Sequence, residues 1–214
     1  MKYRSAYLAS ALVAATVMIS PVSAEQTDWT KRVTQSSMGG HVMGNPLARH
    51  KLTEYMSYTC NHCAAFEKES HSDLTAKHVK KGHISFEVRN LIRTKFFGNH
   101  RALLLQQSTW LTKFQAASPE VMKTMNDGTV PQRLKKIAKA AGLDTLMKGR
   151  GFTPAAIDAC LSDKGEQDKI LAMTEYARTT LKLSGTPSFT LADQPLAKVH
   201  SWEALQPRLA SLPQ

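Results

Sequence analysis

Two stretches of the chain alternate apolar and polar residues with the two-residue period of a β-strand. In residues 51–58 this pattern places Glu54 on the same face as Leu52 and Met56, so a carboxyl group is expected among apolar side chains. In residues 83–89 the side chains expected to point inward are Ile84, Phe86 and Val88, and those expected to point outward are Ser85, Glu87 and Arg89. Both stretches are therefore predicted to be strands.

A helix is predicted between these two strands. Phe66, Ser70, Leu74 and His78 recur at helical spacing. Gly82 is a suitable residue to end the helix, because glycine readily adopts the left-handed conformation of a C-cap. The order strand, helix, strand predicts a βαβ unit with a parallel crossover.

Residues 95–183 are helical in pattern throughout. The signs of individual helices are the apolar spacing of Leu103, Leu104, Gln107, Leu111 and Phe114, a start at Pro131 with a stop at Gly142, a start at Thr153 and Pro154, and the spacing of Ile170, Thr174, Ala177 and Leu181. This stretch is predicted to be an all-α block inserted between two parts of a sheet.

Strand signals resume in residues 187–191 and 196–200, on either side of a turn predicted at residues 193–195. Ser201 is placed to cap a final helix, and Pro207 within that helix is expected to bend it. The apolar stripe of this helix is Trp202, Leu205, Leu209 and Leu212. The C-terminal part is therefore predicted to be a ββα unit.

The N-terminus has the pattern of a secretory signal peptide. Lys2 and Arg4 precede an apolar run over residues 6–19, which is too short to span a bilayer, and residues 22–24 form a small-residue cleavage pattern. We expect cleavage after residue 24, which leaves a mature chain of about 190 residues. The alternative is an uncleaved N-terminal anchor. No later segment is apolar for long enough to cross a membrane, so the mature protein is expected to be soluble and exported.

The chain is basic, but its charge does not indicate a nucleic-acid partner. Removal of the signal peptide would lower the net charge from +11 to +9. The densest basic groups, residues 77–81 and 133–136, lack the interleaved aromatic residues of a nucleic-acid platform. Solvated helix faces explain them better.

Cys60 and Cys63 form a Cys-x-x-Cys pair at the predicted start of the helix, and Cys160 is the remaining cysteine. A bond between Cys60 and Cys63 closes a tiny loop and constrains the unfolded chain little, so the pair is expected to serve redox chemistry rather than stability. No second Cys-x-x-Cys or spaced Cys/His pair completes a zinc site, so no metal is expected. Cys160 is interpreted as a small buried apolar residue, with a second redox cysteine or an intermolecular bridge as the alternative.

The helix start also predicts which sulfur is the nucleophile. Unpaired backbone amides and the helix dipole stabilise a thiolate at Cys60, which is expected to form the mixed disulfide. Cys63 lies one turn into the helix and would resolve it. His62 can donate a hydrogen bond to the Cys60 thiolate and add positive charge when it is protonated. The alternative is an exposed loop histidine without a role.

A βαβ unit, a helical insertion and a closing ββα unit describe an α/β protein with a thioredoxin fold interrupted by an all-α domain. The chain resembles the DsbA family of thiol:disulfide oxidoreductases over nearly its whole mature length. The resemblance is carried by Gly44-Asn45-Pro46, by Glu54, by Tyr58-Thr59-Cys60-Asn61-His62-Cys63 with Ala64-Ala65-Phe66, and by Gly185-Thr186-Pro187-Ser188-Phe189. Asn61 departs from the proline most common at this position in the family, which leaves the redox potential open. The expected division is 25–94 and 184–214 for the thioredoxin-like parts and 95–183 for the insertion.

The resemblance implies further site residues. Glu54 stands where DsbA relatives carry a buried acid beneath the active site, and it would exchange protons with Cys63. Its alternative is a strand-edge glutamate in water. Thr186 and Pro187 resemble the cis-proline motif that faces the cysteines of thioredoxin-like oxidoreductases. There the Thr186 backbone would pair with a substrate strand beside Cys60.

The function implied is that of a periplasmic dithiol oxidase. It would accept cysteine pairs from newly exported chains, donate the Cys60–Cys63 disulfide without any cofactor, and be reoxidised by a membrane partner of the DsbB type. Two alternatives stay open. One is a reductase or isomerase of the same fold, and the other is a Cu(I) chaperone that binds the ion through Cys60 and Cys63, because paired thiolates suit that ion.

Overall fold

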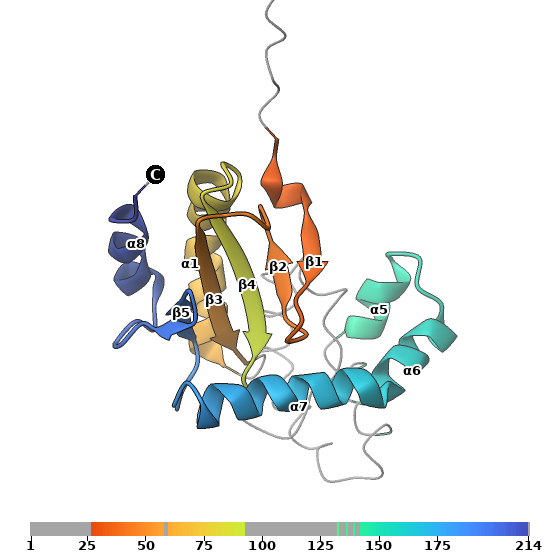
Figure 1. Ribbon diagram of the computed structural model, residues 1–214. Helices are drawn as coiled ribbons and strands as arrows, with labels where there is room; N and C mark the ends of the chain where they lie inside the picture. Colours follow the sequence, from red (N-terminus) through yellow and green to blue (C-terminus); the bar gives the residue numbers. More distant parts are fainter. Residues whose placement is uncertain are drawn as a thin grey trace, which may run out of the picture.

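The computed structural model describes residues 27–57, 60–92 and 142–213, together with residues 132, 136 and 139. Its centre is a six-stranded mixed sheet with the strand order β1-β2-β4-β3-β5-β6 (Figure 1). The strands are β1 (Val33–Gln35), β2 (His41–Met43), β3 (His50–Met56), β4 (Ile84–Asn90), β5 (Ser188–Leu191) and β6 (Gln194–Pro195). The helices are the 3-10 helix η1 (Trp29–Lys31), α1 (Asn61–Asp73), the π-helix η2 (Leu74–Val79), α5 (Leu143–Lys148), α6 (Pro154–Ser162), α7 (Lys164–Thr179) and α8 (Trp202–Ala210).

The predicted βαβ unit is confirmed. β3 pairs in parallel with β4 over its whole length, and α1 and η2 form the connection between them. Gly82 ends the connection with a φ of +81°, the left-handed conformation that glycine adopts without steric cost. Because β3 also pairs antiparallel with β5, it lies at the centre of the sheet.

The prediction that Ser85, Glu87 and Arg89 point to solvent is wrong. Every residue of β4 is buried, because the strand lies between β2 and β3 and both faces of the sheet are covered there. The charges are satisfied internally. Glu87 accepts hydrogen bonds from Ser36 Oγ at 2.5 Å and from Arg89 Nε and Nη2 at 2.8 and 2.9 Å, while Arg89 Nη1 donates to the Tyr55 hydroxyl at 2.8 Å. The alternation of apolar and polar residues predicted the two faces of the strand, but it did not predict that the polar side chains form a buried network.

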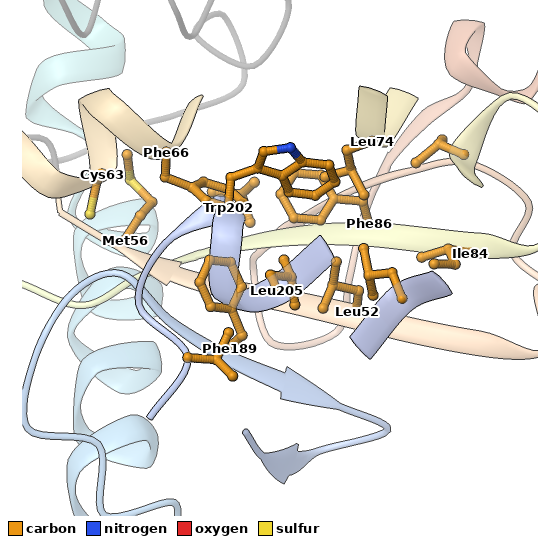
Figure 2. Close-up of a cluster of buried hydrophobic side chains, with 14 of the residues drawn as sticks. Leu52, Met56, Cys63, Phe66, Leu74, Ile84, Phe86, Phe189, Trp202 and Leu205 are labelled. Atoms are coloured by element: carbon orange, nitrogen blue, oxygen red, sulfur yellow. The ribbon is translucent and has the colours of Figure 1, made fainter. Parts of the chain in front are cut away.

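The main hydrophobic core lies between helices α1 and α8 and the face of the sheet that carries Ile84, Phe86 and Val88 (Figure 2). Leu52 and Leu205 belong to this core from β3 and α8. The Phe66 ring on α1 packs against Phe189 of β5, with ring centroids 4.7 Å apart, and edge-on against Trp202 of α8 at 6.4 Å. Phe66 thus links α1 to both C-terminal elements.

Every regular element that the structure describes between β4 and β5 is a helix, as the predicted insertion requires. Gly142 adopts a φ of +70° as the N-cap of α5, and most of the helix predicted to end there lies outside the described residues. Thr153 caps α6, since its Oγ1 accepts a hydrogen bond from Ala156 N at 3.2 Å. The helix predicted around residues 103–114 lies outside the described residues.

The strand predicted for residues 196–200 is wrong, and β6 consists of Gln194–Pro195 instead. Ala192 and Asp193 form the two-residue connection from β5, with φ values of +49° and +60°. Positive φ at both positions is typical of the type I′ hairpin, which places the second strand earlier than predicted. The chain then turns away from the sheet, with Lys198 at a φ of +62°.

Helix α8 begins as predicted. Ser201 Oγ accepts a hydrogen bond from Ala204 N at 3.3 Å, and Trp202, Leu205 and Leu209 are buried on one stripe. Pro207 lies inside the helix. Within the described residues, none of the helices combines the length and the apolar character needed to cross a bilayer. The predicted signal peptide lies outside the described residues.

Candidate active site

Cys60 and Cys63 lie at the N-terminus of α1. Cys60 is the N-cap residue, and Cys63 stands one turn into the helix, where only 1% of its surface is exposed. Figure 2 shows Cys63 beside Met56 and Phe66 at one end of the core. Both cysteines are free thiols. Cys60 is also buried, with 0% of its surface exposed, so both sulfurs of the pair belong to the main core at the start of α1.

The surroundings of Cys60 favour its thiolate. The hydrogen bond from the Cys63 side chain is the largest influence and, against the opposing effect of burial, the total lowers the pKa of Cys60 from 9.0 to about 5. Thr186 and the backbone amides of His62 and Cys63 contribute in the same direction. At neutral pH the Cys60 sulfur is thus a thiolate in the reduced protein.

Cys63 behaves in the opposite way. Burial is the largest cause that raises the pKa of its thiol far above the usual value, and the nearby Cys60 and Glu54 add to the effect. Cys63 therefore keeps its proton at neutral pH. The two sulfurs have distinct protonation states, as expected for a nucleophile and its partner.

His62 is exposed on the first turn of α1, as is Asn61. The backbone amide of His62 is one of the groups that lower the pKa of Cys60. A role for the imidazole stays a prediction.

Glu54 lies in the centre of the sheet with 3% of its surface exposed, so the alternative of a strand-edge glutamate in water is excluded. It faces the core on the same side as Val88, its partner in the register of β3 and β4. Burial is the main cause that raises the pKa of Glu54 well above 4.5, and the charges of Glu67 and Cys60 act in the same direction. Glu54 is thus a buried carboxyl group whose protonated form is favoured, and it lies close enough to Cys63 to affect the ionisation of that thiol.

Residues 185–188 approach Cys60 from the start of β5, and we call them the cis-proline loop. The Thr186–Pro187 peptide bond is cis, as predicted. Cys60 Sγ donates a hydrogen bond to the Thr186 carbonyl oxygen at 3.1 Å. The Thr186 hydroxyl oxygen is buried without a hydrogen bond of standard geometry, yet Thr186 lies close enough to lower the pKa of Cys60. We interpret it as a donor that is free to turn to the thiolate.

Two residues near this site were not predicted from the sequence. Glu67 on α1 is buried although it lies in a polar stretch, and its charge acts on Glu54. Its position four residues after Cys63, next to Phe66, is the signal that indicates the inner face of the helix. His200 donates from Nδ1 to the Pro187 carbonyl oxygen at 2.8 Å, a contact between a side chain and the backbone that has no sequence pattern.

Cys160 lies on α6, outside the hydrophobic cluster that contains Cys60 and Cys63. It is half-buried, and burial raises the pKa of its thiol. Among the residues that the structure describes, no group of three or more His, Cys, Asp or Glu side chains is arranged to hold a metal ion.

Comparison with known proteins places this geometry in a family. Residues 36–210 match the family model described as Thioredoxin. The crystal structure of a protein-disulfide isomerase from Novosphingobium aromaticivorans superposes with a TM-score of 0.68 at 32% sequence identity, over 81% of this chain and 96% of that one. The crystal structure of alpha-DsbA1 from Wolbachia pipientis shares the fold, with a TM-score of 0.57 at 17% identity over 83% of this chain and 92% of that one.

A relative in Rickettsia bellii (strain RML369-C), named "Putative protein-disulfide oxidoreductase", is 26% identical over 148 residues. The match includes 69% of this chain but spans only 55% of the length of that relative. The family model and the Novosphingobium structure each cover most of the chain. The chain therefore belongs to the thioredoxin family, and it shares its fold with the DsbA protein of Wolbachia pipientis.

Proposed function

We propose that this chain is an exported dithiol oxidase that introduces disulfides into other exported proteins through Cys60 and Cys63. The observation that carries the proposal is the pKa of Cys60, which the site lowers to about 5. Stabilisation of the thiolate stabilises the reduced protein, and a protein with a stable reduced form gives up its disulfide readily.

The first step is attack by a substrate thiolate on Cys60 Sγ of the oxidised protein. A bond forms between the substrate sulfur and Cys60, and the Cys60–Cys63 bond breaks, so Cys63 takes the electron pair. Because the site raises the pKa of the Cys63 thiol, the departing sulfur requires a proton. Glu54 is the group that we assign to supply it, since burial favours the protonated form of its carboxyl and the group lies within the same buried region.

The second step releases the product. A second substrate thiolate attacks the substrate sulfur of the mixed disulfide, and Cys60 leaves as the thiolate that the site stabilises. The substrate loses two electrons and gains a disulfide, and the protein returns to the dithiol state. Renewed oxidation requires an external thiol oxidant, for which we propose a membrane partner of the DsbB type.

The cis-proline loop is the proposed substrate-binding element. The Thr186 backbone lies beside Cys60, so an extended segment of substrate can pair with it in the manner of an added strand. Such recognition depends on the backbone and suits unfolded or partly folded exported chains of varied sequence. The N-terminal signal pattern in residues 1–24 supports the periplasm as the compartment.

An isomerase is the second candidate, because the Novosphingobium structure carries that name. An isomerase must be kept reduced, whereas the oxidase must be kept oxidised, so the two share the chemistry of Cys60 and differ in redox poise. The Cu(I) chaperone is disfavoured because Cys63 is buried and holds its proton, which makes it a poor second thiolate ligand.

The deciding experiment is equilibration of the mature protein with mixtures of reduced and oxidised glutathione, followed by quantification of the Cys60–Cys63 disulfide. The oxidase proposal expects a disulfide that glutathione reduces easily, together with stoichiometric oxidation of a dithiol peptide. A midpoint as reducing as that of thioredoxin would contradict it. Cys160→Ala is the matched control, because it removes a thiol that lies outside the site, and it is expected to leave the midpoint unchanged.

A further inference from the structure

The cis-proline loop is held by a side chain that the proposed reaction does not use. Consecutive carbonyl oxygens of this loop each accept a hydrogen bond, namely Gly185 from Ser188 Oγ at 2.8 Å, Thr186 from Cys60 Sγ at 3.1 Å and Pro187 from His200 Nδ1 at 2.8 Å. The carbonyl that His200 binds thus directly follows the one that binds the nucleophile. A shift of one peptide unit moves its neighbour, so this contact bears on the geometry at Cys60.

The topology of the sheet explains why a side chain is needed here. The Phe189 carbonyl oxygen accepts a hydrogen bond from Leu196 N at 2.8 Å at the outer edge of β5. Backbone groups two residues apart point to the same edge of a strand, so the Pro187 carbonyl lies at that edge too. β6 is only Gln194–Pro195, and the chain turns away at Lys198, so the His200 side chain takes the place of a partner strand.

The segment that carries His200 is also fixed to the active-site helix. Val199 and Trp202 on either side of it are buried in the main core. Trp202 contacts Phe66 of α1 edge-on. One short segment therefore contacts both sides of the site, with His200 on the cis-proline loop and Trp202 on the helix that starts after Cys60.

We propose that His200 is a positioning residue that fixes the cis-proline loop in register with Cys60 through its Nδ1–H. The inference rests on the proposed function, because the loop matters only if a substrate of Cys60 lies along it. A carbonyl oxygen only accepts hydrogen bonds, so Nδ1 must carry the proton. The neutral His200 side chain is thus the Nδ1–H tautomer, with Nε2 unprotonated.

Substitutions at His200 separate the position of the donor from the size of the side chain. His200→Asn keeps an amide donor at the place of Nδ1, whereas His200→Gln moves the donor to the place of Nε2 and His200→Ala removes it. We expect the Gln and Ala variants to lower kcat/KM for oxidation of a dithiol peptide by about threefold to tenfold, the range of one neutral hydrogen bond, chiefly through KM. The Asn variant is expected to stay close to the wild-type value.

His50 offers a matched control. Its Nε2 lies 2.9 Å from the Pro213 carbonyl oxygen, so it makes the same kind of hydrogen bond at the end of β3 remote from Cys60. His50→Ala is expected to leave KM and the glutathione equilibrium unchanged. Nitrogen-15 NMR of the wild-type protein provides a readout without turnover, in which His200 should show the Nδ1–H tautomer and His50 the Nε2–H tautomer.

An Nε2–H tautomer at His200 would overturn the inference, and so would wild-type KM values in both the Gln and Ala variants. If the wild-type protein itself fails to exchange disulfides with the peptide, the proposed function fails and the role of His200 in it fails with it. The two failures are distinguishable, because activity in the wild type with no effect of the His200 variants contradicts the positioning role alone.

Discussion

Cys60 Sγ and the Thr186 carbonyl oxygen, 126 residues apart in the sequence, lie 3.1 Å apart across the active site. In the thiol state Cys60 donates to this carbonyl. A thiolate has no proton to donate, so the neighbouring donors must take over. These are the Cys63 thiol, the backbone amides of His62 and Cys63, and Thr186. The nucleophile thus has partners in both protonation states, and its ionisation exchanges one set of hydrogen bonds for another.

The Cys60 thiolate should be visible in a pH titration. Absorbance of the reduced protein at 240 nm is expected to rise with a midpoint near pH 5, because the site lowers the pKa of Cys60 to about 5. Cys63 should not titrate in the same range, since burial raises the pKa of its thiol. The disulfide form is the blank, and a midpoint between pH 8 and 9, about the ordinary value for cysteine, would contradict the geometry.

The relative effects of two substitutions test which neighbour lowers the pKa of Cys60 most. Cys63→Ala removes the largest influence on Cys60, and Thr186→Val removes a smaller one without a change of shape. Both are expected to raise the pKa of Cys60, and Cys63→Ala should raise it more. The measurement is the same titration at 240 nm. A larger shift in the Thr186 variant would mean that the loop, and not the helix, controls the thiolate.

Redox state and pH should be linked through stability. In the dithiol form the folded-state pKa of Cys60 is below the ordinary 9.0, so its thiolate stabilises the fold fully above about pH 9 and less as the pH falls to about 5. The disulfide form has no such thiolate. We therefore expect the dithiol form to resist urea better than the disulfide form at pH 8, with the difference shrinking towards pH 5. Equal midpoints at pH 8 would contradict an oxidising poise.

Much of the site follows from local sequence patterns. The βαβ unit could be predicted because the alternation around Glu54 and the helical spacing after Cys63 each reflect one element. Glu67 and the network on β4 could not, because a charged residue in a polar stretch looks the same whether it faces water or a buried partner. Glu87 becomes tolerable in the interior only through Arg89 and Ser36, which the fold brings to it.

The wrong prediction of a strand at residues 196–200 has a different cause. Ala192 and Asp193 adopt positive φ without glycine, so the sequence lacks the usual signal for a two-residue hairpin. The pattern placed the turn at residues 193–195 instead of 192–193, and it placed the start of the strand two residues too late. Because of the same shift, His200 was predicted to be the last residue of a strand. In the structure its side chain instead forms a hydrogen bond with the Pro187 carbonyl oxygen.

Glu54→Gln should slow the chemistry and change the pH dependence of stability. Glutamine cannot supply a proton to Cys63, so reduction of the disulfide by a peptide thiol is expected to slow by roughly a hundredfold. The folded-state pKa of Glu54 is above 4.5, so its contribution to stability is present below pH 4.5 and is lost as the pH rises towards the folded-state value. In the disulfide form the variant should therefore gain urea resistance over the wild type as the pH is raised.

Glu69 provides the control for Glu54. It lies exposed on α1, so Glu69→Gln makes the same replacement of a carboxyl by an amide without a change in the buried region. We expect neither the rate of disulfide reduction nor the pH dependence of stability to move. A similar slowing in both variants would assign the effect of Glu54 to the overall field and not to proton transfer.

The buried network on β4 should affect stability and leave redox chemistry alone. Arg89→Met leaves the Glu87 carboxylate without its charged partner in the interior. Removal of one partner of a buried ion pair lowers the free energy of unfolding by about 3–5 kcal/mol. The double variant Glu87→Gln with Arg89→Met removes both charges and is expected to recover most of that loss in urea unfolding. The network lies on the face of the sheet opposite α1, because Glu87 and Arg89 alternate with the core residues Phe86 and Val88. The glutathione equilibrium of every folded variant should therefore match the wild type, and a shift would show that the two faces of the sheet are coupled.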